Sequence, residues 1–357
     1  MYALVNDMKN NKKKNLIILI SLLVTTIIIF IISIFVGSAN MTLNEAIGAL
    51  FGSGANNHIV IMQKIRLPRS MAALLVGASL SLSGLIMQTS LGNDMASPST
   101  LGVTNAATFG ANVAIIGFAG GFLATGNNIG NYFSSSNVYS TSVVAFVFAF
   151  LSVLITLALC KIKSFSKETV ILAGIAIGAI FQAFTSLLQF YATDVSLSAA
   201  IVWSFGDLSR ASYSVDLMIL VVLVISSIFF MLYKNHLNAL LSGDEAAKSV
   251  GVKVEALRFV LLLISSIIVA ICISNIGIIG FVGLICPHIA KRIFGHNHKY
   301  TIPASILLGS LLLLVADSLA RVVGNGSEIP VGIITSIIGA PFFLFIIFRK
   351  RRGDNNA

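Results

Sequence analysis

Apolar runs of membrane-spanning length, roughly 20 residues each, dominate the chain and are separated by short polar or Gly- and Pro-containing segments. Hydrocarbon offers the backbone no water, so only helices and closed β-barrels can cross it. The alternating pattern of barrel strands is absent, which leaves helices. With 57% hydrophobic and 10% charged residues, the 357-residue chain is not an ordinary soluble globule. The sequence therefore predicts an all-α, polytopic membrane helical bundle.

The apolar runs predict about ten transmembrane helices. They fall approximately at 16–36, 68–90, 101–124, 141–160, 169–192, 215–233, 257–276, 279–294, 302–323 and 330–348. The run at 279–294 is short for a full crossing and contains Pro287, so we expect a kinked or partly re-entrant helix there. No linker or soluble domain is evident, so residues 1–357 are predicted to form a single membrane domain.

Lysine and arginine are distributed unevenly between the two sides of this predicted bundle. Eighteen of the 23 fall within residues 9–14, 161–167, 234–258, 291–299 and 349–352. Because cytoplasmic loops carry an excess of these residues, both ends are predicted to be cytoplasmic, including the tails 1–15 and 349–357. We expect a multi-pass protein of the cytoplasmic (inner or plasma) membrane. The net charge of +10 then reflects topology and contact with lipid, and no nucleic-acid partner is expected.

A polar segment with the sequence LLSGDEAAKSVGV, at residues 240–252, lies between two predicted spans. Ser242 is placed to cap a short helix, with Glu245 reaching back to the cap backbone, and Asp244 suits the positive end of the helix dipole. Gly251 supplies a left-handed stop. A helix of about two turns is marginal in water, so packing must order it. It is either a docking element or an ordinary cytoplasmic loop, and periodicity alone does not decide.

Neither metal-binding nor enzymatic motifs are found. His288, in CPHIAKR, has no second ligand at suitable spacing, so a structural role is expected, and His296 and His298 are expected to be solvated. No GxxxxGK[ST], GxSxG or HExxH pattern occurs. The cysteines form no CxxC pair and are expected to be buried apolar side chains. They are Cys160, Cys272 and Cys286.

Positive charges on the predicted outer side are exceptions that need a reason. Lys64, Arg66 and Arg69 lie there, and Arg321 lies four residues after Asp317 near the outer end of its span. Residues four apart share a helix face, so Asp317 and Arg321 can pair. From the residues alone, headgroup contacts and a structural ion pair account for these charges.

The order LxGDEAAxxxGV, apolar span, GxIGFVGLxxPHIxR resembles the permease subunits of ATP-driven (ABC) importers for iron chelates, haem and cobalamin. Four further blocks occur in the family's order: RLPRSMAALLVGASLSLSGLIMQ, NDMASPSTLGV, LAGIAIGA and IPVGIITSIIGAPFFLFII. The resemblance covers nearly all of residues 66–352. It implies a type II ABC importer permease fold, a homo- or heterodimer of permeases, cytoplasmic ABC ATPase subunits and an extracytoplasmic substrate-binding (lipo)protein.

The resemblance also implies roles for particular residues. Coupling to the ATPase would involve Ser242, Gly243, Asp244, Glu245, Ala246 and Gly251. Arg66, Arg69 and Arg321 would receive carboxylates of the binding protein. The translocation gate would involve Asn93, Met95, Ser166 and Lys167 at the cytoplasmic mouth and Thr193 near the outer constriction. The family loop usually has the sequence NPLAxP, whereas this chain has NDMASP, without the first proline.

The resemblance implies transport of an iron chelate, siderophore or haem, with cobalamin as the alternative. ATP would bind to the partner subunit, so this chain would need no cofactor or metal and would not be an enzyme. An ion-coupled secondary transporter is the rival class, and it predicts charged residues within spans. Asp317 is the nearest candidate, and Arg321 can neutralise it. An intramembrane enzyme would need a clustered catalytic set, and none is evident.

Overall fold

A computed structural model describes residues 2–37, 41–118, 138–163, 165–324 and 329–348, and these ranges contain helices and no β-strand. The cytoplasmic tail predicted at 349–357 lies outside them. In chain order the helices are α1 (Tyr2–Phe35), α2 (Leu43–Leu50), α3 (Asn56–Val60), α4 (Leu67–Leu91), α5 (Val103–Asn112), α7 (Val138–Lys163), α8 (Lys167–Phe190), α9 (Asp194–Ser204), α10 (Tyr213–Leu232), α11 (Lys234–Leu240), α12 (Asp244–Ser249), α13 (Val254–Ile276), α14 (Val282–Phe294), α15 (His298–Val323) and α16 (Val331–Phe348).

Seven helices of the described part are long and apolar enough to cross a membrane: α1, α4 with the turns before it, α7, α8, α10, α13 and α15. The other three predicted spans correspond to α5 with its π-helical extension η3 (Val113–Phe118), to α14 and to α16. The run 279–294, expected to form a kinked or partly re-entrant helix, corresponds to α14, which begins at Val282 after a break in the helices at 277–281 and continues through Pro287. The prediction of an all-α bundle with about ten apolar helices is confirmed.

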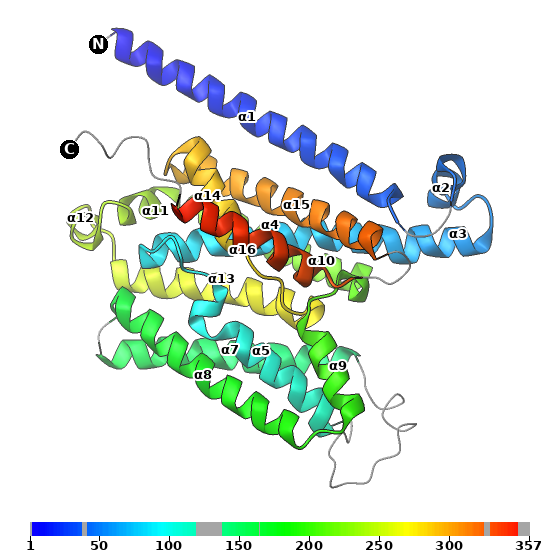
Figure 1. Ribbon diagram of the computed structural model, residues 1–357. Coiled ribbons are helices and arrows are strands. Elements are labelled where there is room, and N and C mark those ends of the chain that lie inside the picture. The colour runs from blue at the N-terminus through cyan, green and yellow to red at the C-terminus, as the bar shows by residue number, and fades with distance from the viewer. Residues whose placement is uncertain (1, 38–40, 119–137, 164, 325–328, 349–357) are drawn as a thin grey trace.

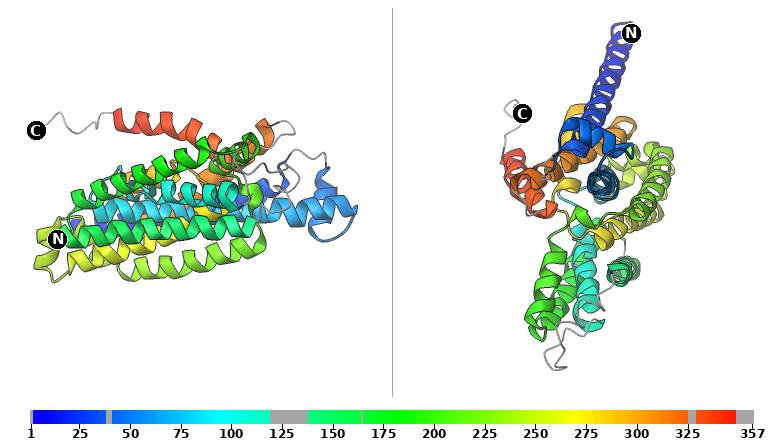
Figure 2. Two further views of the ribbon diagram at one scale, coloured as in Figure 1. Left: turned by 90° about the horizontal axis from the view of Figure 1, so that it is seen from below. Right: turned by 90° about the vertical axis from the view of Figure 1, so that its right-hand side faces the viewer.

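Helix α4 lies at the centre of the bundle, and nearly all of its residues are buried. It packs against α13, α14 and α15 (Figures 1 and 2). Glycines allow the close approach: a Cβ on Gly77 would lie 2.3 Å from the Gly309 carbonyl oxygen, and one on Gly84 would lie 1.9 Å from that of Gly283. Small residues let helices approach closely in a bilayer. The small residues of α4 therefore pack in the bundle interior.

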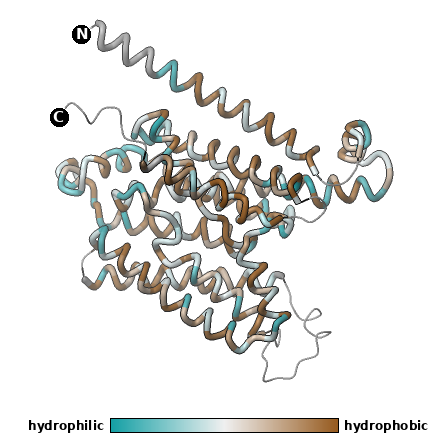
Figure 3. Tube along the Cα trace, in the orientation of Figure 1, coloured by the Kyte–Doolittle hydropathy of each residue, from teal (hydrophilic) through white to brown (hydrophobic). Residues whose placement is uncertain are grey.

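The two ends of the bundle carry different short elements. Helices α11 and α12 lie at one end, together with the start of α1, whereas α2, α3 and α9 lie at the other (Figure 1). The hydropathy colouring follows this arrangement, with apolar residues along the long helices and polar residues around α12 (Figure 3). α4 begins at the end near α3 and finishes at the end near α12 (Figure 1). We call the first of these the α12 end and the second the α2 end. The candidate site has one part at each end.

Two side chains near polar stretches of the sequence are buried. Trp203 lies on α9, which Thr193 caps and which begins at Asp194, and it is covered by the bundle. His298, expected to be solvated, is also buried, with its ring nitrogens within hydrogen-bond distance of Thr89 Oγ1 and Asn238 Oδ1. In both cases tertiary packing covers a side chain that its local sequence places among polar residues. His296 is exposed, as expected.

Candidate functional site

The coupling segment forms α12, a helix of six residues at the α12 end of the bundle. The predicted capping box at Ser242 was wrong. The N-cap is Gly243, at φ +99° and without a side-chain cap, and Glu245 instead lies 3.5 Å from Lys248. The Ser242 amide donates to the Ala239 carbonyl and so belongs to the turn that ends α11. Glycine accommodates this left-handed turn between two helices without a Cβ clash.

The end of α12 agrees with the prediction. Gly251 has φ +86°, and its amide donates to the Lys248 carbonyl. The next amide, of Val252, donates to the carbonyl of Ala247. This pair of bonds satisfies carbonyls that a short helix leaves open. Of the six residues in α12 only Ala247 is fully buried, so packing alone holds the helix weakly.

Asp244 supplies the additional attachment of α12. Its two carboxylate oxygens each accept a hydrogen bond of 2.8 Å from Nη2 of Arg258, and Lys167 Nζ lies 3.2 Å away. Partial burial alone would raise the pKa of Asp244, but the hydrogen bonds from Arg258 and Lys167 outweigh it and hold that pKa below its ordinary value. The carboxylate is therefore ionised at neutral pH and fastens α12 to α13 and α8.

Arg258 reaches three separate segments from the first turns of α13. Besides Asp244, its Nε donates to the Ser90 carbonyl at 2.7 Å, and its Nη1 donates to the Phe165 carbonyl at 3.2 Å. Its side chain is 1% exposed. The sequence analysis did not single out this arginine, although a charged residue at the second position of the predicted span 257–276 was a usable signal.

The loop that follows α4 contains the first pair of predicted gate residues. α4 ends at Gly92, which is left-handed at φ 56°, and Asn93 Oδ1 then accepts a hydrogen bond from the Met95 amide. Asp94, between them, pairs with Nζ of Lys291 on α14 at 2.7 Å. Burial would raise the pKa of Asp94, but the hydrogen bond and the charge of Lys291 outweigh it and lower that pKa.

The second pair of predicted gate residues begins α8. The Ser166 hydroxyl caps this helix by accepting from the Thr169 amide at 3.1 Å, and Lys167 is the first helical residue. A Cβ on Gly92 would lie 3.0 Å from Lys167 Nζ, so the two predicted gate loops adjoin each other. The structure therefore brings together Asn93, Met95, Ser166 and Lys167 beside α12. Thr193 lies at the far end of α8, where it caps α9.

An apolar cavity of about 210 Å³ adjoins the gate loop. It is lined by Ser97, Pro98 and Ser99 from that loop, by Leu80 of α4, and by residues of α13 and of the break at 277–281. Sites for drug-sized ligands occupy roughly 300–1,000 Å³. The cavity is therefore too small for a bulky chelate, and a passage of that size must open elsewhere or at another stage of transport.

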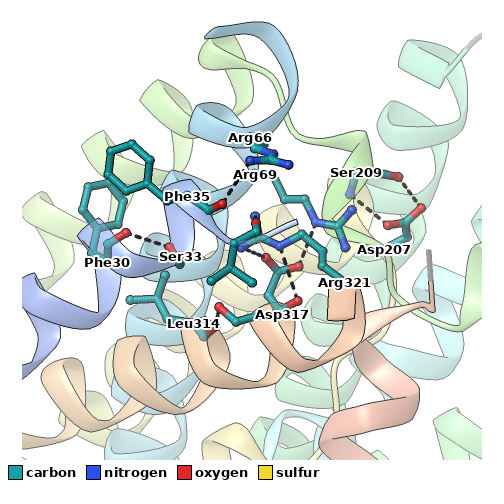
Figure 4. Close-up of polar contacts among 12 residues, drawn as sticks. Phe30, Ser33, Phe35, Arg66, Arg69, Asp207, Ser209, Leu314, Asp317 and Arg321 are labelled. Atoms are coloured by element: carbon teal, nitrogen blue, oxygen red, sulfur yellow. Dashed lines mark hydrogen bonds and ion pairs between the residues drawn. The ribbon is translucent and has the colours of Figure 1, made fainter. Parts of the chain in front are cut away.

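The predicted docking arginines lie together at the α2 end and are buried (Figure 4). The predicted pairing of Asp317 with Arg321 is confirmed at 2.8 Å, and the same carboxylate also receives Nε of Arg69 at 2.8 Å. The ion pair of Arg69 with Asp317 joins α4 to α15. Two guanidinium groups therefore share the carboxylate of Asp317.

Two of these arginines also hold the end of α1. Arg66 Nη1 donates to the Phe35 carbonyl at 3.1 Å, and Arg321 Nη1 donates to the Val36 carbonyl at 2.9 Å. The last carbonyls of a helix lack intrahelical partners and carry partial negative charge, so cations suit this position. These bonds to the end of α1 explain why Arg66 and Arg321 are buried. Their predicted role in docking a binding protein is not tested by these contacts.

The described residues contain no group of three or more His, Cys, Asp or Glu side chains that could hold a metal ion. Cys160, Cys272 and Cys286 are free thiols and buried, as expected. A helical membrane bundle with a short exposed helix fastened to two loops at one end, and a cluster of cations at the other, has the architecture of a transport permease.

The comparisons with known proteins give the family. Residues 25–349 match the model of the FecCD transport family, and the chain belongs to that family. A protein of Methanocaldococcus jannaschii, described provisionally as an ABC transporter permease protein, is 40% identical over 89% of this chain and 90% of its own length.

Two further relatives have names that state a cargo. The iron(3+)-hydroxamate import system permease protein of Bacillus subtilis is 33% identical, covering 90% of this chain and 93% of its own. The hemin transport system permease protein of Yersinia pestis is also 33% identical, with the same coverage. Among solved structures, an inward-facing ABC transporter described provisionally as metal-chelate type superposes with a TM-score of 0.78 at 29% identity, covering 94% of this chain and 100% of that one. The fold is that of a type II ABC importer permease, and the chain is a multi-pass inner-membrane protein.

Proposed function

We propose that this chain is the transmembrane permease subunit of an ABC importer that carries an iron chelate, siderophore or haem, across the cytoplasmic membrane. The observation that carries the proposal is the coupling arrangement at the α12 end, where Asp244 fastens a short exposed helix to Arg258. The same guanidinium group binds the carbonyls of Ser90, near the end of α4, and of Phe165, before α8. The named cargoes of the relatives from B. subtilis and Y. pestis support an iron chelate.

The outward surface of α12 suits a protein partner. Glu245 and Ala246 are exposed, whereas Asp244 and Ala247 face the bundle. A separate cytoplasmic ABC ATPase would bind this surface. That ATPase, rather than this chain, would bind and hydrolyse ATP. Closure of two ATPase subunits would then displace α12 and the helices attached to it, since packed elements switch between discrete arrangements. Both ends of the chain would then be cytoplasmic, as the lysine and arginine distribution predicts.

The α2 end would receive the extracytoplasmic substrate-binding (lipo)protein. Acidic side chains of such a partner would pair with Arg66, Arg69 and Arg321, the positions at which the permeases that this chain resembles receive carboxylates. The test is binding-protein affinity, measured for Arg66→Gln with Lys64→Gln as an exposed control. We expect Arg66→Gln to weaken binding by about tenfold or more and Lys64→Gln to have little effect. Equal effects of the two substitutions would contradict docking at the arginine cluster.

The passage for the cargo would lie between two permease subunits, of this chain or of this chain and a second one. The cavity of about 210 Å³ beside the gate loop is too small for a chelate. α8 supports this arrangement, because it carries predicted gate residues and has large exposed apolar side chains such as Leu172, Ile180 and Leu187. Residues 1–357 would form a single membrane domain in each subunit.

Substitution of Glu245 by lysine tests the proposed ATPase surface. We expect Glu245→Lys to insert and accumulate normally but to uncouple uptake from ATP hydrolysis, because the outward face of α12 changes charge. Glu255→Lys is the matched control, since Glu255 is also an exposed carboxylate near the same end, in the first turn of α13. Unchanged uptake in Glu245→Lys, or equal losses in both variants, would count against α12 as the docking surface.

The cargo is tested on the cognate binding protein. Fluorescence quenching measures its affinity for haemin, a ferric hydroxamate, ferric citrate and cobalamin, with molybdate as an oxyanion control. We expect tight binding of one of the iron chelates. Preference for cobalamin would make this chain a cobalamin permease with the same coupling mechanism.

A further inference from the structure

The guanidinium group of Arg258 is the contact that three segments distant in the sequence have in common. Its Nη2 binds both carboxylate oxygens of Asp244 on α12, its Nε binds the carbonyl of Ser90 near the end of α4, and its Nη1 binds the carbonyl of Phe165 before α8. Asn93 follows Ser90 by three residues, and Ser166 follows Phe165 directly. One side chain therefore contacts the proposed ATPase-docking helix and the chain next to both predicted gate loops.

The chemistry of this position requires arginine. A guanidinium group has five donors in a rigid, planar arrangement and can serve a carboxylate and two carbonyl groups in different directions at once. Lysine carries the same charge on a single nitrogen, which cannot reach three such positions. The side chain is almost completely buried, so its donors depend on these partners for hydrogen bonds. Displacing one partner leaves a buried donor without a hydrogen bond, which costs free energy.

Three charged side chains surround this guanidinium among the described residues. Asp244 forms an ion pair with it, Lys167 of α8 binds the same carboxylate, and Glu168 of α8 interacts with it electrostatically. A displacement of α12 therefore acts on Asp244, and through Asp244 on both Arg258 and Lys167. Lys167 belongs to the gate pair on α8, so the carboxylate gives α12 a second, direct contact with that loop.

We propose that Arg258 is a positioning residue that joins α12 and the two loops of the cytoplasmic mouth into one mechanical unit, so that movement of α12 displaces both loops together. The inference rests on the proposed function, because it assigns the docking surface to α12 and the gate to these loops. It adds the side chain through which the two are connected.

Hydrogen–deuterium exchange of the full-length chain in nanodiscs, without any ATPase, tests the joint attachment. Arg258→Lys is expected to accelerate amide exchange about tenfold in three separate segments at once, 243–249, 90–96 and 165–169, because local opening governs exchange. Lys253→Gln is the matched control, a cation removed from an exposed position near α12, and is expected to leave all three unchanged. Acceleration confined to 243–249, or absent, would overturn the proposal.

Transport measurements with the ATPase and binding protein test the consequence. Arg258→Lys is expected to keep the ATPase bound and hydrolysing ATP while cargo moved per ATP falls about tenfold, a change that a purely stabilising residue would not produce. Asp244→Asn leaves the two carbonyl bonds of Arg258 in place and provides a milder variant should Arg258→Lys fail to fold. It is expected to lower the same ratio, and the double variant is expected to be no worse than Arg258→Lys, because residues in one network are not additive.

The outcomes separate the two levels of inference. An unchanged ratio of cargo to ATP in both single variants, or additive losses in the double variant, would overturn the role of Arg258 while leaving the importer assignment in place. If the wild-type chain does not bind an ATPase, the proposed function fails. The exchange measurement on the chain alone then still decides whether Arg258 holds the three segments together.

Discussion

The carboxylate of Asp94 lies 2.7 Å from the ammonium nitrogen of Lys291, and this pair fastens the loop after α4 to α14. Lys291 is nearly buried and also donates to Gln88 Oε1 on α4 at 2.8 Å. Permeases that this chain resembles usually have proline where Asp94 stands. Without the proline ring the loop loses one backbone restraint, and the ion pair between Asp94 and Lys291 restrains it instead.

Substitution of Asp94 is expected to destabilise the protein more than substitution of Lys291. Asp94→Ala leaves a buried ammonium group with Gln88 alone and should cost about 1–3 kcal/mol. Lys291→Met removes the buried charge, and the half-exposed Asp94 then turns to water, so the loss should be smaller. Thermal unfolding in detergent measures both. A larger loss for Lys291→Met would contradict this account of the loop.

The shared carboxylate at the α2 end should be among the most sensitive positions in the chain. Asp317→Asn leaves Arg69 and Arg321 buried without their common counterion, and removing one partner of a buried ion pair costs about 3–5 kcal/mol. Asp207→Asn, at the same end, weakens only local bonds, those that the carboxylate accepts from the Ser209 amide and hydroxyl, and should cost about 1 kcal/mol. The measurement is thermal stability together with the amount of folded protein. Similar values for both variants would contradict the sharing of Asp317 by Arg69 and Arg321 (Figure 4).

Two glycines test the packing around α4. A Cβ at Gly84 would lie 1.9 Å from the Gly283 carbonyl oxygen, whereas one at Gly280 would meet only the Ser336 hydroxyl, at 3.6 Å. Gly84→Ala should therefore destabilise the bundle by more than about 3 kcal/mol, and Gly280→Ala by less than about 1 kcal/mol. Size-exclusion profiles and thermal unfolding of the two variants provide the comparison. Equal tolerance would show that α4 and α14 do not approach as closely as described.

The attachment of α12 should depend on pH in one direction. The folded-state pKa of Asp244 lies below its ordinary value of 3.8, so its contribution to stability is present above about that pH and is lost as pH falls through the lowered value. A spin label at Ser249→Cys should be immobile from neutral pH to about pH 5 and become mobile only below the ordinary pKa. The native cysteines are buried and do not compete for label. With Asp244→Asn added, the label should be mobile throughout, and a transition near neutral pH would contradict the ion pair.

Several features could be predicted from the sequence because they depend on local chemistry. Apolar length predicts helices, and the turn chemistry of Thr42 and Glu45 predicts α2, where both bonds of a capping box form. The pairing of Asp317 with Arg321 follows from helical spacing. By contrast, the capping box predicted at Ser242 does not form, although the residues of the pattern are present. Gly243 has a positive φ and is itself the N-cap, so the helix begins at Asp244.

The contacts that assemble the site could not be predicted, because they join residues far apart in the chain. Neither Arg69 with Asp317 nor Arg258 with Ser90 follows from any local pattern. Asp216 was overlooked for another reason: it lies near the edge of a predicted span, but the structure buries it in the first turn of α10, where its carboxylate oxygens have no hydrogen-bond partner among the described residues. It is therefore the side chain through which an ion-coupled mechanism would be examined.

The most direct test places the purified chain, its ATPase and its binding protein in liposomes and measures uptake of the iron chelate against its gradient. The account predicts uphill uptake with ATP on the ATPase side, lowered about tenfold by Arg258→Lys, and no uptake driven by an imposed proton or sodium gradient alone. Uphill uptake by the chain without the ATPase, driven by such a gradient and lost in Asp216→Asn, would contradict it.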